Sequence, residues 1–292
     1  MNESDFAFLR ALLQRKSGIA LGSDKLYLAD SRLSILCRKR NVDSIDTLMR
    51  QLRLGREPEL ESAIVEAMTT NETLFFRDQT PFTLFRDVIL PERLAVNAAR
   101  RQLRIWCAAV SSGQEAYSLA MILEDMAERL AGWRIEILGT DISGEILEKA
   151  RAGVYSQFEV QRGLPIQMLL RHFTQVGDKW HISDRLRSMV EFRQHNLLDA
   201  SDSLGQFDAI FCRNVLIYFD PPTKTRVLAR LAQRLAPQAS LVLGATETVL
   251  GLPSDFTPDR DNRGLIRLSR DIRPSPLPLP MAARGAGLAR PL

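Results

Sequence analysis

Two carboxylates, Glu115 and Asp141, stand where an α/β protein is expected to bind a nucleoside. Asp141 follows an apolar run and lies 26 positions beyond Glu115, near the spacing at which a carboxylate accepts the hydroxyls of a ribose. Residues 108–113 read Ala-Ala-Val-Ser-Ser-Gly, and such small residues let a ligand approach the backbone. The single glycine does not make a G-x-G-x-x-G loop, which argues against a dinucleotide. The pattern therefore favours a site for a single nucleoside.

Both carboxylates also have purely structural interpretations. Asp141 can cap a helix that starts at Ser143. Residues 112–115 fit the S-x-x-E capping box, in which Glu115 only closes the first turn of a helix. The residues alone leave these alternatives open.

The elements that must position these side chains begin at residue 103, where β-rich runs alternate with longer helical stretches. This alternation predicts a parallel sheet with crossover helices, whose ligands bind at the carboxyl ends of the strands. The expected strands are residues 103–107, 134–140, 190–194, 207–212 and 240–245. The expected helices are residues 114–130, 144–152 and 222–235. An interruption at about 156–190 predicts an inserted small subdomain with a hairpin at Gly177-Asp178.

The ends of the chain differ in pattern from this domain at 103–272. Apolar residues at helical spacing predict a small all-helical N-terminal domain over 1–75, and residues 76–102 are expected to form a linker helix. The last segment, 273–292, contains five prolines and predicts a disordered tail. The expected fold class is thus α/β with a preceding all-α domain.

Composition narrows the class of protein further. No apolar run approaches the roughly 20 residues that span a bilayer, and the acidic, polar N-terminus lacks the features of a secretory signal. A cytoplasmic protein without membrane insertion is therefore expected. The three cysteines and three histidines are scattered without ligand spacing, so no metal site is expected.

Residues 70–78, Thr-Asn-Glu-Thr-Leu-Phe-Phe-Arg-Asp, resemble the N-E-T-x-F-F-R-D signature of the chemotaxis receptor methyltransferases, the CheR family. Four further segments, 106–120, 139–143, 195–198 and 207–219, resemble motifs of that family in the same order. The similarity runs from the N-terminal helices to about Leu268. Five separated motifs in the right order argue strongly against coincidence.

The resemblance implies a Rossmann-like methyltransferase that uses S-adenosylmethionine, releases S-adenosylhomocysteine and needs no metal. It implies that glutamate side chains of bacterial chemoreceptors are converted to methyl esters in chemotaxis adaptation. The family pattern places the following residues around the cofactor: Asn71, Thr73, Arg77, Glu115, Asp141, Asn196, Leu197, Asn214 and Val215.

These residue types suit the parts of the cofactor. Arg77 can hold its carboxylate, Asn196 can read the adenine edge with Leu197 packed on the ring, and Asp141 is preferred over Glu115 for the ribose. Tyr218 is the candidate catalytic residue, with packing on the sheet as the alternative.

The expected chemistry is simple, because a glutamate is already ionised at neutral pH and a neutral thioether leaves. Orientation of the reactants is then the main contribution to catalysis. Three departures from the family pattern, at Gln114, Ala116 and Ala245, leave the cofactor residues untouched. The alternatives are a methyltransferase for another protein or a small molecule, and a non-catalytic scaffold that binds S-adenosylmethionine.

Basic residues outnumber acidic ones by seven to two between residues 32 and 56, which suits an acidic partner such as a glutamate-bearing receptor helix. No aromatic residues are interleaved for base stacking, so no nucleic-acid partner is expected. A merely solvated basic face is the alternative. In the family, the inserted hairpin also contributes receptor contacts. The basic residues are Arg32, Arg38, Lys39, Arg40, Arg50, Arg53 and Arg56.

Overall fold

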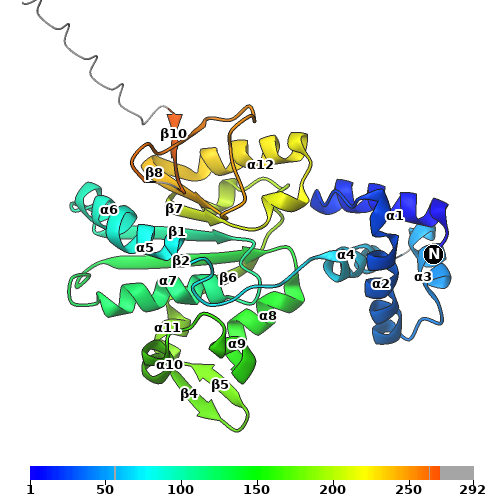
Figure 1. Ribbon diagram of the computed structural model, residues 1–292, viewed down its shortest axis with the longest axis horizontal. Coiled ribbons are helices and arrows are strands. Elements are labelled where there is room, and N and C mark those ends of the chain that lie inside the picture. The colour runs from blue at the N-terminus through cyan, green and yellow to red at the C-terminus, as the bar shows by residue number, and fades with distance from the viewer. Residues whose placement is uncertain (56, 263, 270–292) are drawn as a thin grey trace, which may run out of the picture.

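The computed structural model describes residues 1–55, 57–262 and 264–269 (Figure 1). Arg56 and the tail expected at 273–292 lie outside them. The N-terminal domain is helical, as expected, and its core is built from the apolar faces of its helices. Its elements are α1 (Glu3–Ser17), the 3-10 turn η1 (Ser23–Lys25), α2 (Leu26–Arg40), α3 (Ile45–Leu54) and α4 (Pro58–Met68).

The expected linker at 76–102 is not a free connection between the domains. It forms α5 (Thr80–Leu84), the π-helical turn η2 (Phe85–Ile89) and α6 (Leu90–Val96). Phe82, Phe85 and Ile89 are buried in the core of the larger domain, so their apolar faces bind this segment to the sheet. The π-turn lies just before Pro91, which lacks an N–H and cannot continue the regular helical bonding.

The larger domain is built on a seven-stranded sheet with the order β6-β2-β1-β7-β8-β10-β9. The five expected strands are confirmed and pair in parallel. The strand β8 begins earlier than expected, and the two antiparallel strands that follow it in the sheet, β10 and β9, were not predicted. The bounds are β1 (Gln102–Ala108), β2 (Arg134–Asp141), β6 (Val190–Gln194), β7 (Phe207–Cys212), β8 (Leu235–Leu243), β9 (Phe256–Pro258) and β10 (Leu265–Leu268).

Helices cover both faces of this sheet (Figure 1). Successive residues of β1 alternate between two cores: Ile105 and Cys107 pack with α7 (Gln114–Asp125), whereas Trp106 packs with α12 (Pro221–Arg234). The helix α8 (Gly144–Ala152) has the expected bounds, but α7 ends at Asp125 rather than Leu130. Beyond Asp125 the chain continues in tighter turns, in which backbone N–H groups donate hydrogen bonds to the carbonyls of residues three positions earlier.

The inserted subdomain forms a separate antiparallel sheet with the order β3-β5-β4 (Figure 1). The expected hairpin at Gly177 is confirmed, and a third strand joins it. Its elements are β3 (Val154–Ser156), α9 (Gln157–Gln161), α10 (Ile166–His172), β4 (Phe173–Val176), β5 (Lys179–Ile182) and α11 (Asp184–Ser188). Among the described residues, no helix combines the length and apolar character needed to cross a membrane.

The C-terminal end of α1 lies against the segment between β7 and α12. Ile19 forms an antiparallel bridge with Phe219, and the backbone N–H of Ala20 donates to the carbonyl of Tyr218 over 2.8 Å. On the other side, the Glu66 carboxylate of α4 accepts a hydrogen bond of 2.6 Å from the N–H of Gly144. The helical domain is thereby held at the carboxyl ends of the strands.

Candidate active site

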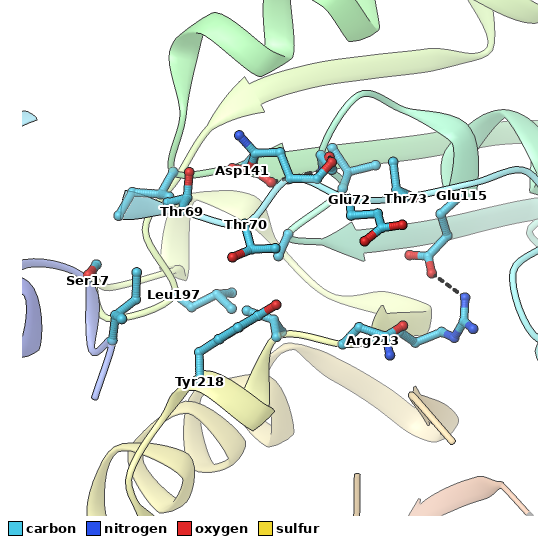
Figure 2. A pocket seen from close by; sticks show the side chains of 18 of the residues that line it. Ser17, Thr69, Thr70, Glu72, Thr73, Glu115, Asp141, Leu197, Arg213 and Tyr218 are labelled. Carbon is cyan, nitrogen blue, oxygen red and sulfur yellow. Dashed lines mark hydrogen bonds and ion pairs between the residues drawn. The ribbon is translucent and has the colours of Figure 1, made fainter. Parts of the chain in front are cut away.

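A cleft lies at the carboxyl ends of β1, β2, β6 and β7, between the sheet and the helical domain (Figure 2). It encloses about 1020 Å³ of space including its open mouth. The structure brings all ten candidate site residues, from five separate segments, to the wall of this cleft. They are Asn71, Thr73, Arg77, Glu115, Asp141, Asn196, Leu197, Asn214, Val215 and Tyr218.

The helical domain also lines the cleft, which was not predicted from the sequence. Ser17 and Ile19, at the end of α1, and residues 68–70, after α4, form part of its wall. The side chain of Arg32 holds this second segment, because its guanidinium donates to the carbonyls of Met68 and Thr69. The cleft is therefore a joint product of both domains.

Strained backbone surrounds the cleft. Ala109, Ser111 and Asn214 all have positive φ angles, of 61°, 53° and 58°, although none is glycine. Such conformations cost about 1–3 kcal/mol each and persist only where other contacts hold them. Ser111 is held twice, since its N–H donates to Asp141 and its hydroxyl donates to the carbonyl of Asn71 over 2.8 Å.

The Asp141 carboxylate joins the loop after β1 to the start of α8. One oxygen accepts from the N–H of Ser111 over 2.9 Å, and the other accepts from the N–H of Ser143 over 3.0 Å. The cap of α8 is Ser143 itself, whose hydroxyl accepts from the N–H of Ile146, so Asp141 is not the helix cap. Each carboxylate oxygen can accept a further bond. Burial raises the pKa of Asp141, and the nearby charge of Glu66 adds to this effect.

This raised pKa predicts a pH dependence of nucleoside binding. A protonated Asp141 loses acceptor capacity for ribose hydroxyls, so we expect affinity for S-adenosylhomocysteine to fall as pH drops through the raised pKa. The stability of the fold depends on pH in the opposite direction. Because the pKa of Asp141 is raised in the folded state, its contribution to stability is present at low pH and is lost as pH rises. Calorimetric titration from about pH 8 to about pH 5 tests the binding prediction. An affinity equally pH-dependent in Asp141→Asn would contradict the assignment to Asp141.

Glu115 does not close a capping box. The N-cap of α7 is Gly113, without a side-chain bond, and the hydroxyl of Ser112 donates instead to the side chain of Gln114. The Glu115 carboxylate accepts a hydrogen bond of 2.9 Å from the guanidinium of Arg213 (Figure 2). Burial raises the pKa of Glu115, and the Arg213 charge opposes that shift.

Arg213 is a site residue to which the sequence analysis gave no role. Its side chain is 2% exposed, and its second nitrogen donates to the Asp78 carboxylate and to the carbonyl of Arg77, each over 2.7 Å. It thus joins β7, α7 and the 70–78 segment. An arginine directly after the apolar run of β7 was the signal that could have identified it.

Asn196 and Arg77 make contacts different from those expected. The amide of Asn196 donates to the carbonyl of Lys16 over 2.7 Å and accepts from the N–H of Leu198, so it links the loop after β6 to α1. Arg77 is half-buried and donates to the carbonyl of Glu72 over 3.1 Å. Both side chains retain unused donors for a ligand.

The side chain of Tyr218 reaches both the core and the cleft. Its half-buried ring packs against the core beneath α12, and its hydroxyl points into the cleft (Figure 2).

The three departures from the family pattern lie outside the cleft wall. Gln114 and Ala116 are buried in α7, Ala245 is exposed, and none of them lines the cleft.

Comparison with known families agrees with this geometry. A family model described as the CheR methyltransferase SAM-binding domain matches residues 71–263, and one described as the CheR methyltransferase all-alpha domain matches residues 4–69. The chain belongs to the CheR methyltransferase family. The family assignment confirms the expected fold class and shows that the protein is a methyltransferase with a domain that binds S-adenosylmethionine.

Individual CheR relatives match nearly the whole chain. A chemotaxis protein methyltransferase from Vibrio parahaemolyticus is 43% identical over 269 residues, which cover 91% of this chain and 97% of the relative. Chemotaxis protein methyltransferase 1 from Pseudomonas aeruginosa is 42% identical, over 90% and 97% of the two chains. Among solved structures, magnesium protoporphyrin IX methyltransferase from Synechocystis has a TM-score of 0.32 at 15% identity, over 65% and 78% of the chains, which is too distant to support an argument.

Proposed function

We propose that this CheR methyltransferase transfers the methyl group of S-adenosylmethionine to glutamate side chains on the cytoplasmic helices of chemoreceptors. The products are glutamate methyl esters and S-adenosylhomocysteine. The observation that supports this most strongly is the convergence of ten expected residues, from five segments, on one cleft.

The chemistry of the cleft fits the cofactor. Asp141 offers acceptors for the ribose hydroxyls, and Asn196 with Leu197 stands at the next strand end, where the adenine would lie. Arg77 offers a charged donor for the amino-acid carboxylate. When bound, S-adenosylmethionine supplies an electrophilic methyl group on a sulfonium.

The acceptor needs no general base, because a glutamate carboxylate is ionised at neutral pH. The work of this chain is then to orient the acceptor and to keep water out. The Tyr218 hydroxyl, which points into the cleft, can donate to one oxygen of the acceptor carboxylate while the other attacks. Ser17, Ile19 and Met68 close the cleft from the helical domain and limit the entry of water.

The basic residues of the helical domain are proposed to bind the acidic receptor helix. Several of them are partly engaged within the chain: Lys39 with Glu145, Arg40 with Glu57, and Arg53 with Asp5. Arg32 holds the segment after α4 and is poorly placed to meet a receptor. Arg38 and Arg50 are exposed, which makes them the stronger candidates among the described residues.

Transfer of radiolabelled methyl groups to receptor cytoplasmic fragments tests the proposal. We expect base-labile label on the wild-type fragment and its loss when the acceptor glutamates are changed to alanine. A Tyr218→Phe variant is expected to retain S-adenosylhomocysteine binding and to lose turnover. Tight cofactor binding without ester formation on any receptor fragment would instead favour a scaffold, and label on a different substrate would favour another methyltransferase.

A further inference from the structure

A carboxylate outside the cleft, Glu247, holds the backbone of the segment that carries part of the cleft wall. One oxygen of Glu247 accepts from the N–H groups of Val215 and Leu216, over 3.0 and 2.7 Å. The other oxygen accepts from the N–H groups of Asn214 and Gly244, each over 2.7 Å. Four backbone donors from two segments thus converge on one side chain.

The held segment is part of the site. Asn214 and Val215 line the cleft, and the short turn that follows, η4 (Leu216–Tyr218), carries the Tyr218 hydroxyl into it. Asn214 has a φ of 58°, in the left-handed region, which asparagine tolerates better than most residues but which surrounding contacts must still enforce. The bonds to Glu247 supply that enforcement at the strained residue and at the next two.

The chemistry of the contact requires a carboxylate. An ionised carboxylate only accepts hydrogen bonds and has about four positions for them, which matches the four donors. A glutamine has the same shape but one acceptor oxygen, and its NH₂ group would face two N–H groups that need an acceptor.

The absence of a side chain at Gly244 leaves room for the Glu247 carboxylate beside the backbone of Asn214. A Cβ atom at this position would lie 2.7 Å from the Glu247 carboxylate and 3.0 Å from the backbone nitrogen of Asn214. The departure from the family pattern at Ala245 is exposed and leaves this contact intact.

We propose that Glu247 is a positioning residue for methyl transfer, which fixes the backbone of residues 214–216 and thereby the place of Asn214, Val215 and Tyr218 in the cleft. This inference rests on the proposed function.

The test compares Glu247→Gln with the wild-type full chain. Because a displacement of about 1 Å in an active site can cost 100-fold in rate, we expect kcat for receptor methylation to fall about 30-fold. Affinity for S-adenosylhomocysteine, measured by calorimetry without any receptor, is expected to weaken about tenfold, as for loss of roughly one hydrogen bond.

Asp208→Asn is the matched control. The Asp208 carboxylate stands at the opposite end of β7 and is more deeply buried than the half-buried Glu247. It likewise accepts four hydrogen bonds, from Arg93, Asn97, Arg100 and the backbone of Arg104. It is far from the cleft wall, so this variant is expected to lower Tm while kcat and cofactor affinity stay at wild-type values. A Glu247→Gln variant that only lowers Tm in the same way would overturn the proposal.

Gly244→Ala gives a second route if Glu247→Gln does not fold. The added Cβ displaces the Glu247 carboxylate from the N–H of Asn214 while the carboxylate keeps its charge, and the same loss of kcat is expected. Wild-type kcat in folded Gly244→Ala would also overturn the proposal. If the wild-type chain forms no receptor ester, the proposed function fails, and the cofactor affinities still decide whether Glu247 shapes the site.

Discussion

Replacing Arg213 by methionine is expected to lower the free energy of unfolding by about 3–5 kcal/mol and to abolish cofactor binding. Arg213 and Glu115 form a buried pair, with side chains 2% and 11% exposed. Removing one partner of such a pair leaves an uncompensated buried charge, which accounts for the size of the effect. Arg213 also holds Asp78 and the carbonyl of Arg77, so the 70–78 segment is released at the same time.

Chemical denaturation of Arg213→Met measures this loss. The additional change Glu115→Gln removes the stranded charge, so the double variant is expected to be more stable than Arg213→Met alone. The control is Arg193→Met, whose exposed bidentate pair with Glu191 is expected to contribute less than about 1 kcal/mol. Equal losses at Arg193 and Arg213 would contradict the argument from burial.

The parallel strands were predictable from the sequence because each is an apolar run bounded by turns. Strand β7 and helix α8 were placed to the residue. The polar residues at the strand ends were predictable for the same reason, since the topology brings those ends to one edge of the sheet. Periodicity and topology were sufficient for these features.

Other features depend on contacts between distant segments. Strands β9 and β10 are short and gain their order by pairing, β10 with β8 and β9 with β10, which no local pattern encodes. The capping-box pattern at 112–115 failed because Glu115 binds a buried arginine about a hundred residues away, whereas the same pattern at Ser156 and Glu159 does form a capping box. The local sequence does not determine whether such a glutamate binds the backbone at the start of its helix or a distant arginine.

The participation of the helical domain in the cleft is a further case of this kind. Ile19 follows α1 and reads as part of a short connection, yet it pairs with Phe219 beside the site. Asn196 was expected to read the adenine edge, and its amide also donates to the carbonyl of Lys16 near the end of α1. Docking of the two domains therefore contributes to the geometry of the cofactor site. This contact cannot be predicted from the sequence of either domain taken separately.

Asp141→Asn is expected to weaken S-adenosylhomocysteine binding about 100-fold, because hydrogen bonds to a charged group each contribute about 1.5–3 kcal/mol. The substitution preserves the shape of the side chain. It removes the charge, however, and places an NH₂ group against the N–H of Ser111 or of Ser143, both of which now donate to the carboxylate. The loop at 109–111, whose positive φ angles depend on that contact, is therefore loosened as the ribose acceptor is lost.

Glu136→Gln provides the matched control for this prediction, since Glu136 lies on the same strand and pairs with Arg104 at the end remote from the cleft. Its affinity for S-adenosylhomocysteine is expected to equal that of the wild type. Calorimetry on both variants separates loss of a ligand contact from a general effect of removing a carboxylate from β2. If Asp141→Asn bound the nucleoside as tightly as Glu136→Gln, Asp141 would be a loop-closing residue only, and the ribose would have to be assigned to Glu115.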